Sequence, residues 1–340
     1  MSREDLSKLL MRSSIVTEPH DNESKENKSN WKGHKMDNTS VNTIAQTERD
    51  PHELMAIFEQ AEDLPTLPEV VMRVQKMASD PDSSAKDVAS IIEDDPAIAM
   101  KVLKVVNSVF YAPRHGSEIA ELQPAIARLG FLSVVNIALS TSVFGAFGRA
   151  KSPVFDRREF WKHSVCVGIV ASVLHDYCVN NVNQRLTRDM VHLAGIVHDM
   201  GKILFECYAN PEFHKAIENA VREDIPAIKE ECRFVGMGHD EAGAWLAEKW
   251  GIDKAIQAVV RWHHDPLECP DEEYRGLVKL VHMADYICHN QGLGDSGNPS
   301  ASYDHRVREE LNLTPEKIAD LMSVVEEEAA KSEILLSLTG

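Results

Sequence analysis

Residues 191–202 read VHLAGIVHDMGK, an apolar helical run that ends in a histidine, a carboxylate, a glycine and a lysine. The apolar residues recur at helical spacing, which predicts a buried segment that takes His198 and Asp199 into the interior. An unpaired carboxylate in a core is costly, so it persists only beside a cation, a metal ion or hydrogen-bond donors. A structural pair of His198 with Asp199 is one solution, and a metal site is the other. The partners that the rest of the sequence offers decide between the two.

The composition predicts a globular protein, because 340 residues with 43% hydrophobic content can form one large core or two packed subdomains. No run approaches the roughly 18 consecutive apolar residues that a membrane-spanning helix needs. The N-terminal residues also lack the basic-then-apolar order of a signal peptide. The six cysteines show no CxxC spacing, which suits reduced thiols. We therefore expect a cytoplasmic protein that does not associate with membranes.

The net charge of −18 argues against binding a DNA or RNA backbone, which requires clustered lysines and arginines. The more favourable partners are a protein or a small ligand held through metal ions.

Helical periodicity extends over most of the chain, and strand-like alternation is lacking, so the sequence predicts an all-α fold. Residues 1–50 are poor in apolar residues and are expected to form a disordered tail. Residues 51–150 are expected to form an N-terminal helical part, and residues 151–298 a second helical domain that holds most of the histidines. Residues 299–340 are expected to form C-terminal helices. Asp95 before Pro96 is a typical helix start.

Several histidines and carboxylates fall on or beside apolar helical segments. Glu159 and His163 are four residues apart and so share one helix face. His239 follows Gly238 at an expected helix start, and Asp285 lies in a segment so apolar that an unpartnered carboxylate there would be expensive. The candidate metal ligands are Glu159, His163, His198, Asp199, His239, His263, His264 and Asp285.

This ligand set contains imidazoles and carboxylates but no thiolate. Such ligands suit iron or manganese, leave zinc open, and allow Asp199 to bridge two ions. We expect one to three divalent ions per chain. Any single histidine of the set has an alternative as an ordinary core or surface residue, whereas the whole set in this order favours a metal site.

Three motifs carry a resemblance to a known family. Residues 64–70 read LPTLPEV, residues 94–111 read DDPAIAMKVLKVVNSVFY, and residues 125–130 read AIARLG. Together they resemble the HDOD family of bacterial signal-transduction modules, from about residue 64 to about residue 286. The resemblance implies an all-helical regulatory module that acts through protein contacts.

The order of the ligands resembles the HD superfamily of metal-dependent phosphohydrolases, to which HDOD modules are related. It is similar to the branch that hydrolyses cyclic dinucleotides. That resemblance implies that the eight matching positions hold two or three metal ions, with Asp199 as a catalytic residue. It also implies that Lys202 contacts a phosphate, whereas the plain alternative for Lys202 is an exposed lysine at a helix end.

One departure bears on function. In the phosphodiesterase branch a Gly-Tyr-Pro loop follows the paired histidines, but here His263 and His264 are followed by DPLECP at residues 265–270. Two functions therefore stay open. The first is a regulatory module that acts through protein contacts and uses metal as a structural or sensing element. The second is a metal-dependent phosphohydrolase, such as a phosphodiesterase that acts on a cyclic dinucleotide or another nucleotide.

Overall fold

The structure is a computed structural model. The residues that it describes are 51–61, 73, 84–107, 118–130, 134, 137–138, 154–183, 185–314, 316–318 and 320–325. Within these ranges the chain is helical or irregular and forms no strand, so the predicted all-α fold is confirmed. The tail expected at residues 1–50 lies outside the described residues, as do residues 326–340 of the expected C-terminal helices.

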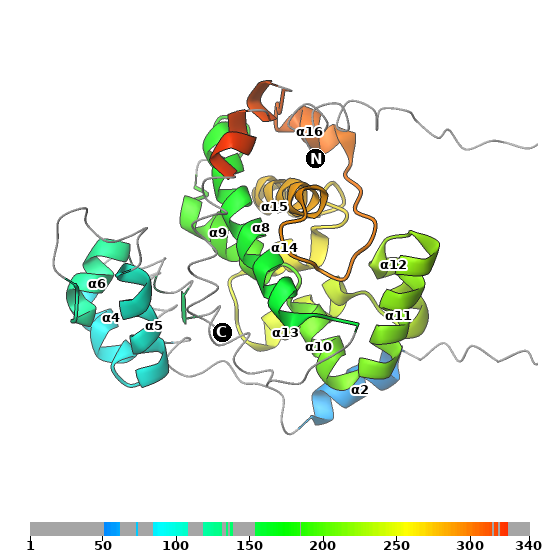
Figure 1. Cartoon of the computed structure of the whole chain (residues 1–340), viewed down its shortest axis with the longest axis horizontal. Helices are drawn as coiled ribbons and strands as arrows, with labels where there is room; N and C mark the ends of the chain where they lie inside the picture. Colours follow the sequence, from blue (N-terminus) through cyan, green and yellow to red (C-terminus); the bar gives the residue numbers. More distant parts are fainter. Residues whose placement is uncertain are drawn as a thin grey trace, which may run out of the picture.

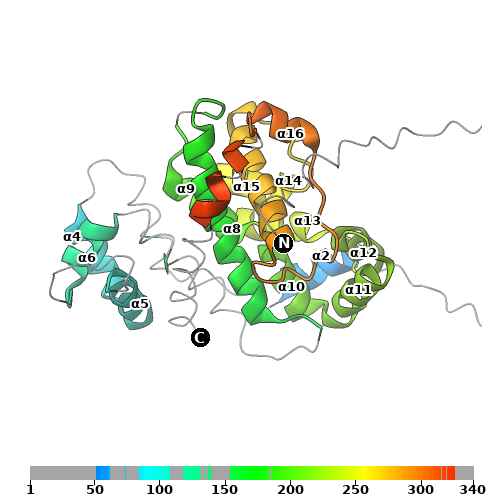
Figure 2. The ribbon, with the colours of Figure 1, turned by 45° about the horizontal axis from the view of Figure 1, so that its top comes forward.

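Three N-terminal helices pack on one another, namely α4 (Ala85–Ile92), α5 (Pro96–Val106) and α6 (Leu122–Leu129). Ser84 and Asp87 form a reciprocal capping box at the start of α4. At α5 the side chain of Asp95 accepts a bond from the Ile98 N–H at 3.1 Å, as the Asp-Pro start predicted. In both overall views this group lies to one side of the remaining helices (Figures 1 and 2).

The second group of helices surrounds α8, the longest helix of the described chain. Helix α8 packs against α9 and α15, while α14 contacts α9, α13 and α15. Helix α13 begins at His239, directly after Gly238, where the sequence predicted a start. The helices of this group are α8 (Arg157–Cys178), α9 (Arg188–Val197), α10 (Met200–Tyr208), α11 (Asn210–Glu223), α12 (Ala227–Phe234), α13 (His239–Lys249), α14 (Lys254–Trp262), α15 (Glu272–Gln291) and α16 (His305–Glu310).

Two helix crossings depend on glycine. Helices α8 and α9 meet at Gly168 and Gly195, where a Cβ on Gly195 would lie 2.6 Å from the Gly168 Cα. Helices α10 and α13 meet at Gly201 and Gly243, where a Cβ on Gly201 would lie 2.7 Å from the Gly243 nitrogen and closer still to the His239 carbonyl oxygen. Real Cβ atoms do not approach other atoms so closely. These contacts bring the α9–α10 junction, with its His-Asp pair, against α8 and α13.

Helix α2 (Pro51–Gln60) lies against this second group rather than beside α4. The fully buried Phe58 ring lies 5.6 Å from the Trp245 ring and 6.0 Å from the Tyr208 ring, between centroids. These contacts attach α2 to α10 and α13 (Figure 1). The boundaries predicted at residues 150 and 298 stay predictions. No helix in the described ranges combines the length and the apolar character needed to cross a membrane.

Candidate metal centre

Seven of the eight predicted ligands converge in the interior of the second helix group. His163 comes from α8 and Asp285 from α15, while His198 and Asp199 occupy the junction of α9 and α10. His239 begins α13, and the histidine pair follows the end of α14. The donor atoms form two groups, each with all atoms within 4.8 Å of one another: Asp199, His239, His263 and His264, and His163, His198 and Asp199. Asp199 therefore belongs to both groups.

The first group is built around one oxygen of Asp199. Its Oδ1 lies 2.9 Å from His239 Nε2 and 3.3 Å from His263 Nε2. His264 Nε2 lies 2.9 Å from His239 Nε2. Several imidazole nitrogens thus face one small space together with a carboxylate oxygen. This is the arrangement that a divalent cation needs.

The second group lies on the other side of Asp199. His198 Nε2 is 3.4 Å from Asp199 Oδ2 and 3.9 Å from Asp285 Oδ1. His163 Nε2 is 3.0 Å from the same Asp285 oxygen. Asp285 thus completes a set of two imidazoles and two carboxylates, with Asp199 between the two groups.

A metal ion fits this donor set on a structural test. Three buried atoms of the centre, His163 Nε2, His198 Nε2 and Asp199 Oδ1, lack a hydrogen bond of good geometry, although Asp285 Oδ1 lies 3.0 Å from His163 Nε2 and His239 Nε2 lies 2.9 Å from Asp199 Oδ1. Buried polar atoms are nearly always partnered, so their concentration here requires an explanation. Divalent cations between imidazole nitrogens and carboxylate oxygens would satisfy all three atoms at once.

The far side of each imidazole determines which nitrogen can act as a ligand. His198 Nδ1 is 2.7 Å from the Gly195 carbonyl oxygen, and His263 Nδ1 is 3.0 Å from that of Val260. Carbonyl oxygens only accept, so each Nδ1 carries the proton and donates it. In the neutral ring the Nε2 lone pair is then free to bind a metal ion in the centre.

His239 is held by a carboxylate that the sequence analysis missed. Its Nδ1–H donates to Glu231 Oε2 at 2.6 Å, and its backbone N–H donates to the same oxygen at 2.9 Å. Glu231 lies on α12 and is completely buried. A sequence signal existed, because Glu231 falls on the helix face of the apolar Ala227 and Phe234.

Lys202 is not the exposed lysine that one alternative predicted. Its side chain is 3% exposed, and its Nζ lies 2.5 Å from Asp199 Oδ2. Burial opposes the charge of Lys202, but the nearby Asp199 and Glu231 carboxylates outweigh it and raise the lysine pKa. Lys202 is therefore an internal counterion of Asp199 in this structure. A contact with phosphate stays a prediction.

The carboxyl groups of the centre are held ionised. Burial alone would raise the pKa of Asp199, but His198, Lys202 and His239 outweigh it and hold that pKa well below its usual value. Burial likewise opposes the charge of Asp285, while His163 and His198 lower its pKa. Ionised carboxylates are the form that binds metal ions.

The imidazoles of the first group differ in their protonation. Burial, reinforced by His263 and His239, holds the pKa of His264 well below its usual value, so this ring is neutral. Burial also acts against the charged form of His239, yet Glu231 reverses the effect and the pKa of His239 rises to about 9. A metal ion at this position would replace the proton on His239 Nε2.

Two predicted ligands lie outside both donor groups: Asp285, which pairs with His163 and His198, and Glu159. Glu159 lies in the first turn of α8, one turn before His163. Its carbonyl oxygen accepts a bond from the Asp295 N–H at 3.1 Å, so the loop after α15 closes over the start of α8. Its role as a metal ligand stays a prediction.

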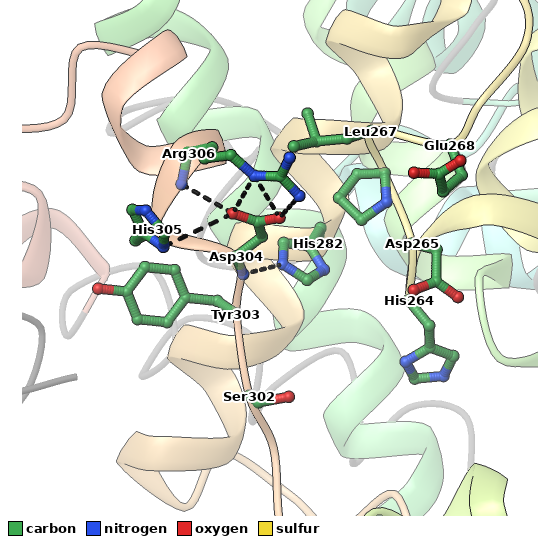
Figure 3. A pocket seen from close by; sticks show the side chains of 11 residues that line it. His264, Asp265, Leu267, Glu268, His282, Ser302, Tyr303, Asp304, His305 and Arg306 are labelled. Atoms are coloured by element: carbon green, nitrogen blue, oxygen red, sulfur yellow. Dashed lines mark hydrogen bonds and ion pairs between the residues drawn. The ribbon is translucent and has the colours of Figure 1, made fainter. Parts of the chain in front are cut away.

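A cavity of about 490 Å³ borders the centre at His264. One wall is the loop that replaces Gly-Tyr-Pro, with Asp265 and Glu268, and the other is the segment 302–306 (Figure 3). His282 forms part of the lining and links both sides: its Nδ1–H donates to the His263 carbonyl at 2.7 Å, and its Nε2 accepts from the Asp304 N–H at 3.2 Å. The segment 265–268, whose sequence differs from that of the phosphodiesterase branch, thus forms part of the cavity wall.

Two solved structures from bacteria resemble the chain in fold. An HDOD domain protein of unknown function from Geobacter sulfurreducens is 26% identical, with a TM-score of 0.68, covering 83% of this chain and 96% of that one. A Marinobacter aquaeolei VT8 protein whose name assigns it to signal transduction is 20% identical, with a TM-score of 0.71, covering 85% of this chain and 64% of that one.

A third structure, from Shewanella amazonensis SB2B, carries the name of a phosphohydrolase. It is 21% identical, with a TM-score of 0.60, and the match covers 84% of this chain and 96% of that one. At 20% and 21% identity, the Marinobacter and Shewanella proteins show a shared fold only.

Sequence comparison gives the family. An uncharacterized protein of Treponema pallidum (strain Nichols) is 26% identical over 229 residues, which are 67% of this chain and 43% of that protein. The chain thus spans less than half the length of this relative. The family model of the HDOD domain matches residues 64–266, which confirms the family that the sequence motifs indicated. Because this match covers more than half of the 340 residues, the chain belongs to the HDOD family.

Proposed function

We propose that this protein is a regulatory signal-transduction module that binds divalent metal ions at the centre and acts through contacts with a signalling protein. One observation carries the metal-binding part: two groups of donor atoms share Asp199 in the interior, and three of their buried atoms lack a hydrogen bond of good geometry. Iron and manganese suit this set best, and zinc is also compatible. The HDOD family and the name of the Marinobacter protein support the signalling part.

The cavity supports a module more than an enzyme. Asp265 and Glu268 lie on its wall, where the phosphodiesterase branch has Gly-Tyr-Pro. The guanidinium of Arg306, on the opposite wall, is paired with Asp304, its Nε lying 3.0 Å from both carboxylate oxygens. The carboxylates of Asp265 and Glu268 would repel a phosphate that entered here.

A metal-dependent phosphohydrolase is the second candidate, and one observation favours it. His264, a donor of the first group, also lines the cavity, so a ligand in the cavity would lie beside the centre. Bound metal ions would supply Lewis-acid stabilisation of a phosphate oxygen. Lys202 would add a positive charge near that oxygen. The substrates to consider are phosphodiesters, including cyclic dinucleotides and other nucleotides.

The metal-binding proposal is tested by metal content. Protein purified without chelators would be measured by plasma mass spectrometry beside Asp199→Ala and, as a control, the exposed-site variant Asp265→Ala. We expect divalent metal in the parent and in Asp265→Ala, and its loss in Asp199→Ala without loss of helical circular dichroism. Equal metal content in all three proteins, or metal in none, would contradict the proposal.

A second measurement separates the two functions. The metal-loaded protein would be incubated with a panel of phosphodiesters and nucleotides on which a known phosphodiesterase is active. Metal retained without turnover supports the regulatory module. Turnover that disappears in Asp199→Ala establishes the phosphohydrolase instead.

A further inference from the structure

The imidazoles of the two donor groups differ in the group that accepts the hydrogen bond from their Nδ1–H. Behind His198 and His263 the Nδ1–H donates to neutral backbone carbonyls. Behind His239 the Nδ1–H donates to the carboxylate of Glu231. A carboxylate behind a ligating imidazole raises its basicity more than a neutral carbonyl does, and it also fixes the ring. His239 is therefore the strongest imidazole donor of these three.

Two hydrogen bonds join Glu231 to His239. Its Oε2 accepts two bonds from the same residue, one from the ring and one from the backbone of His239. These bonds set the first turn of α13 and the plane of the imidazole together. Because Glu231 is completely buried, solvent does not weaken its charge.

The hydrogen bond from His239 to Glu231 affects only the first of the two donor groups. His239 belongs to the group with Asp199, His263 and His264, while the group of His163 and His198 lies on the other side of Asp199. The first group is also the one that reaches the cavity, through His264, so an ion can enter there. His163 and His198 are about 1% exposed or less.

We propose that the two metal positions are unequal: the position of Asp199, His239, His263 and His264 binds its ion more tightly and fills first, and Glu231 is the positioning residue that makes it so. The inference rests on the proposed metal binding. It assigns a hierarchy to the two positions and adds Glu231 to the residues that control metal affinity.

Glu230 offers a matched control for Glu231. Both are buried glutamates on α12, and they are neighbours in the chain. Glu230 instead faces α11, where its Oε2 accepts from Asn219 Nδ2, and it pairs with Arg233 of its own helix at 3.4 Å. Glu231→Gln keeps the size of the side chain and an oxygen that can accept from His239, but it removes the charge. Glu230→Gln makes the same chemical change away from the centre.

The experiment is a titration of the metal-free full-length chain with Co²⁺, followed by calorimetry and by the visible absorption of bound cobalt. Parent, Glu231→Gln, Glu230→Gln and Asp285→Asn would be compared. In the parent we expect a tight and a weaker binding step with different spectra. Glu231→Gln should weaken the tight step by about 10- to 100-fold and alter its spectrum, because a carboxylate partner of a ligating histidine has effects of that size.

The two remaining variants assign the steps. Glu230→Gln should leave both steps unchanged, and Asp285→Asn should weaken only the second step. The inference is overturned if Glu231→Gln binds cobalt like the parent, or if Glu230→Gln weakens binding as much. A parent that binds no Co²⁺ would instead refute the proposed metal binding itself, so the two failures are distinguishable.

Discussion

At the scale of single residues, the centre depends on the side chains that contact the candidate metal ligands as much as on the ligands themselves. Lys202 neutralises Asp199, and Glu231 holds His239. Removing one partner of a buried ion pair costs about 3–5 kcal/mol, because the other charge is left uncompensated. Lys202 is thus expected to matter most when no metal ion shares the charge of Asp199.

Lys202→Met should destabilise the metal-free protein by about 3–5 kcal/mol and the metal-loaded protein by less. The reason is that Asp199 loses its lysine counterion, and bound metal ions would make up for that loss. Urea unfolding of both forms measures the difference. Lys254→Met, at the exposed start of α14, is the control and should change little. An equal loss in the two forms of Lys202→Met would contradict this account.

The sequence predicted part of this centre. The rest depends on contacts between helices, which a sequence pattern does not give. Periodicity showed that His198 and Asp199 are buried, and Gly238 marked the helix start that aims His239 inward. Periodicity predicts which residues are buried but not which residues they contact. It therefore left two alternatives for Lys202, a contact with phosphate and an exposed position at a helix end. Glu231 was missed because its role depends on how α12 packs beside α13.

At the scale of helices, the glycine crossings decide how closely the ligands approach. Periodicity predicted many of the helices, because each has one apolar face. It could not predict the partner of each face, which is set by three-dimensional packing. Helix α2 shows this, since Phe58 packs against Trp245 and Tyr208, far along the chain.

Gly201→Ala should lower stability by about 1–3 kcal/mol and reduce metal binding, because the new Cβ would push α10 away from α13 and separate Asp199 from His239. Gly276→Ala is the matched control on α15, where the nearest atom to a Cβ would be 3.3 Å away on Val182. Thermal unfolding and cobalt titration measure both effects. Normal metal affinity in Gly201→Ala would show that the crossing does not position the ligands.

Phe58→Ala should destabilise the protein by about 3–5 kcal/mol, the usual cost of deleting a buried aromatic side chain. The change removes the contact between α2 and the surface formed by α10 and α13. Met100→Ala, at a side chain that is 59% exposed, should cost far less. Denaturant unfolding of the two variants gives the comparison, and equal losses would argue against the docking of α2.

At the scale of the whole molecule, metal binding should be linked to stability. The donors come from helices α8, α13 and α15, from the junction of α9 and α10 and from the turn after α14, so an ion would hold distant parts of the chain together. A ligand that binds only the folded state at about 100 times its dissociation constant adds about 2.7 kcal/mol. Metal ions should therefore act on the domain as a unit.

Adding Mn²⁺ to the metal-free protein should raise its melting temperature by roughly 5–10 °C, and a chelator should reverse the rise. Differential scanning calorimetry measures the shift. The Asp199→Ala variant serves as the control, since it lacks the carboxylate shared by both groups. A similar shift in that variant would mean that the ions act elsewhere on the molecule.

The ion pair between Lys202 and Asp199 also separates two events in time. The charge of Asp199 is already balanced by a residue of the same chain, so folding does not have to wait for an ion. Under the proposed metal binding, a newly made chain would fold first and take up metal later. Metal occupancy would then vary in the finished protein, and a partner that distinguishes the empty from the filled state would respond to metal supply.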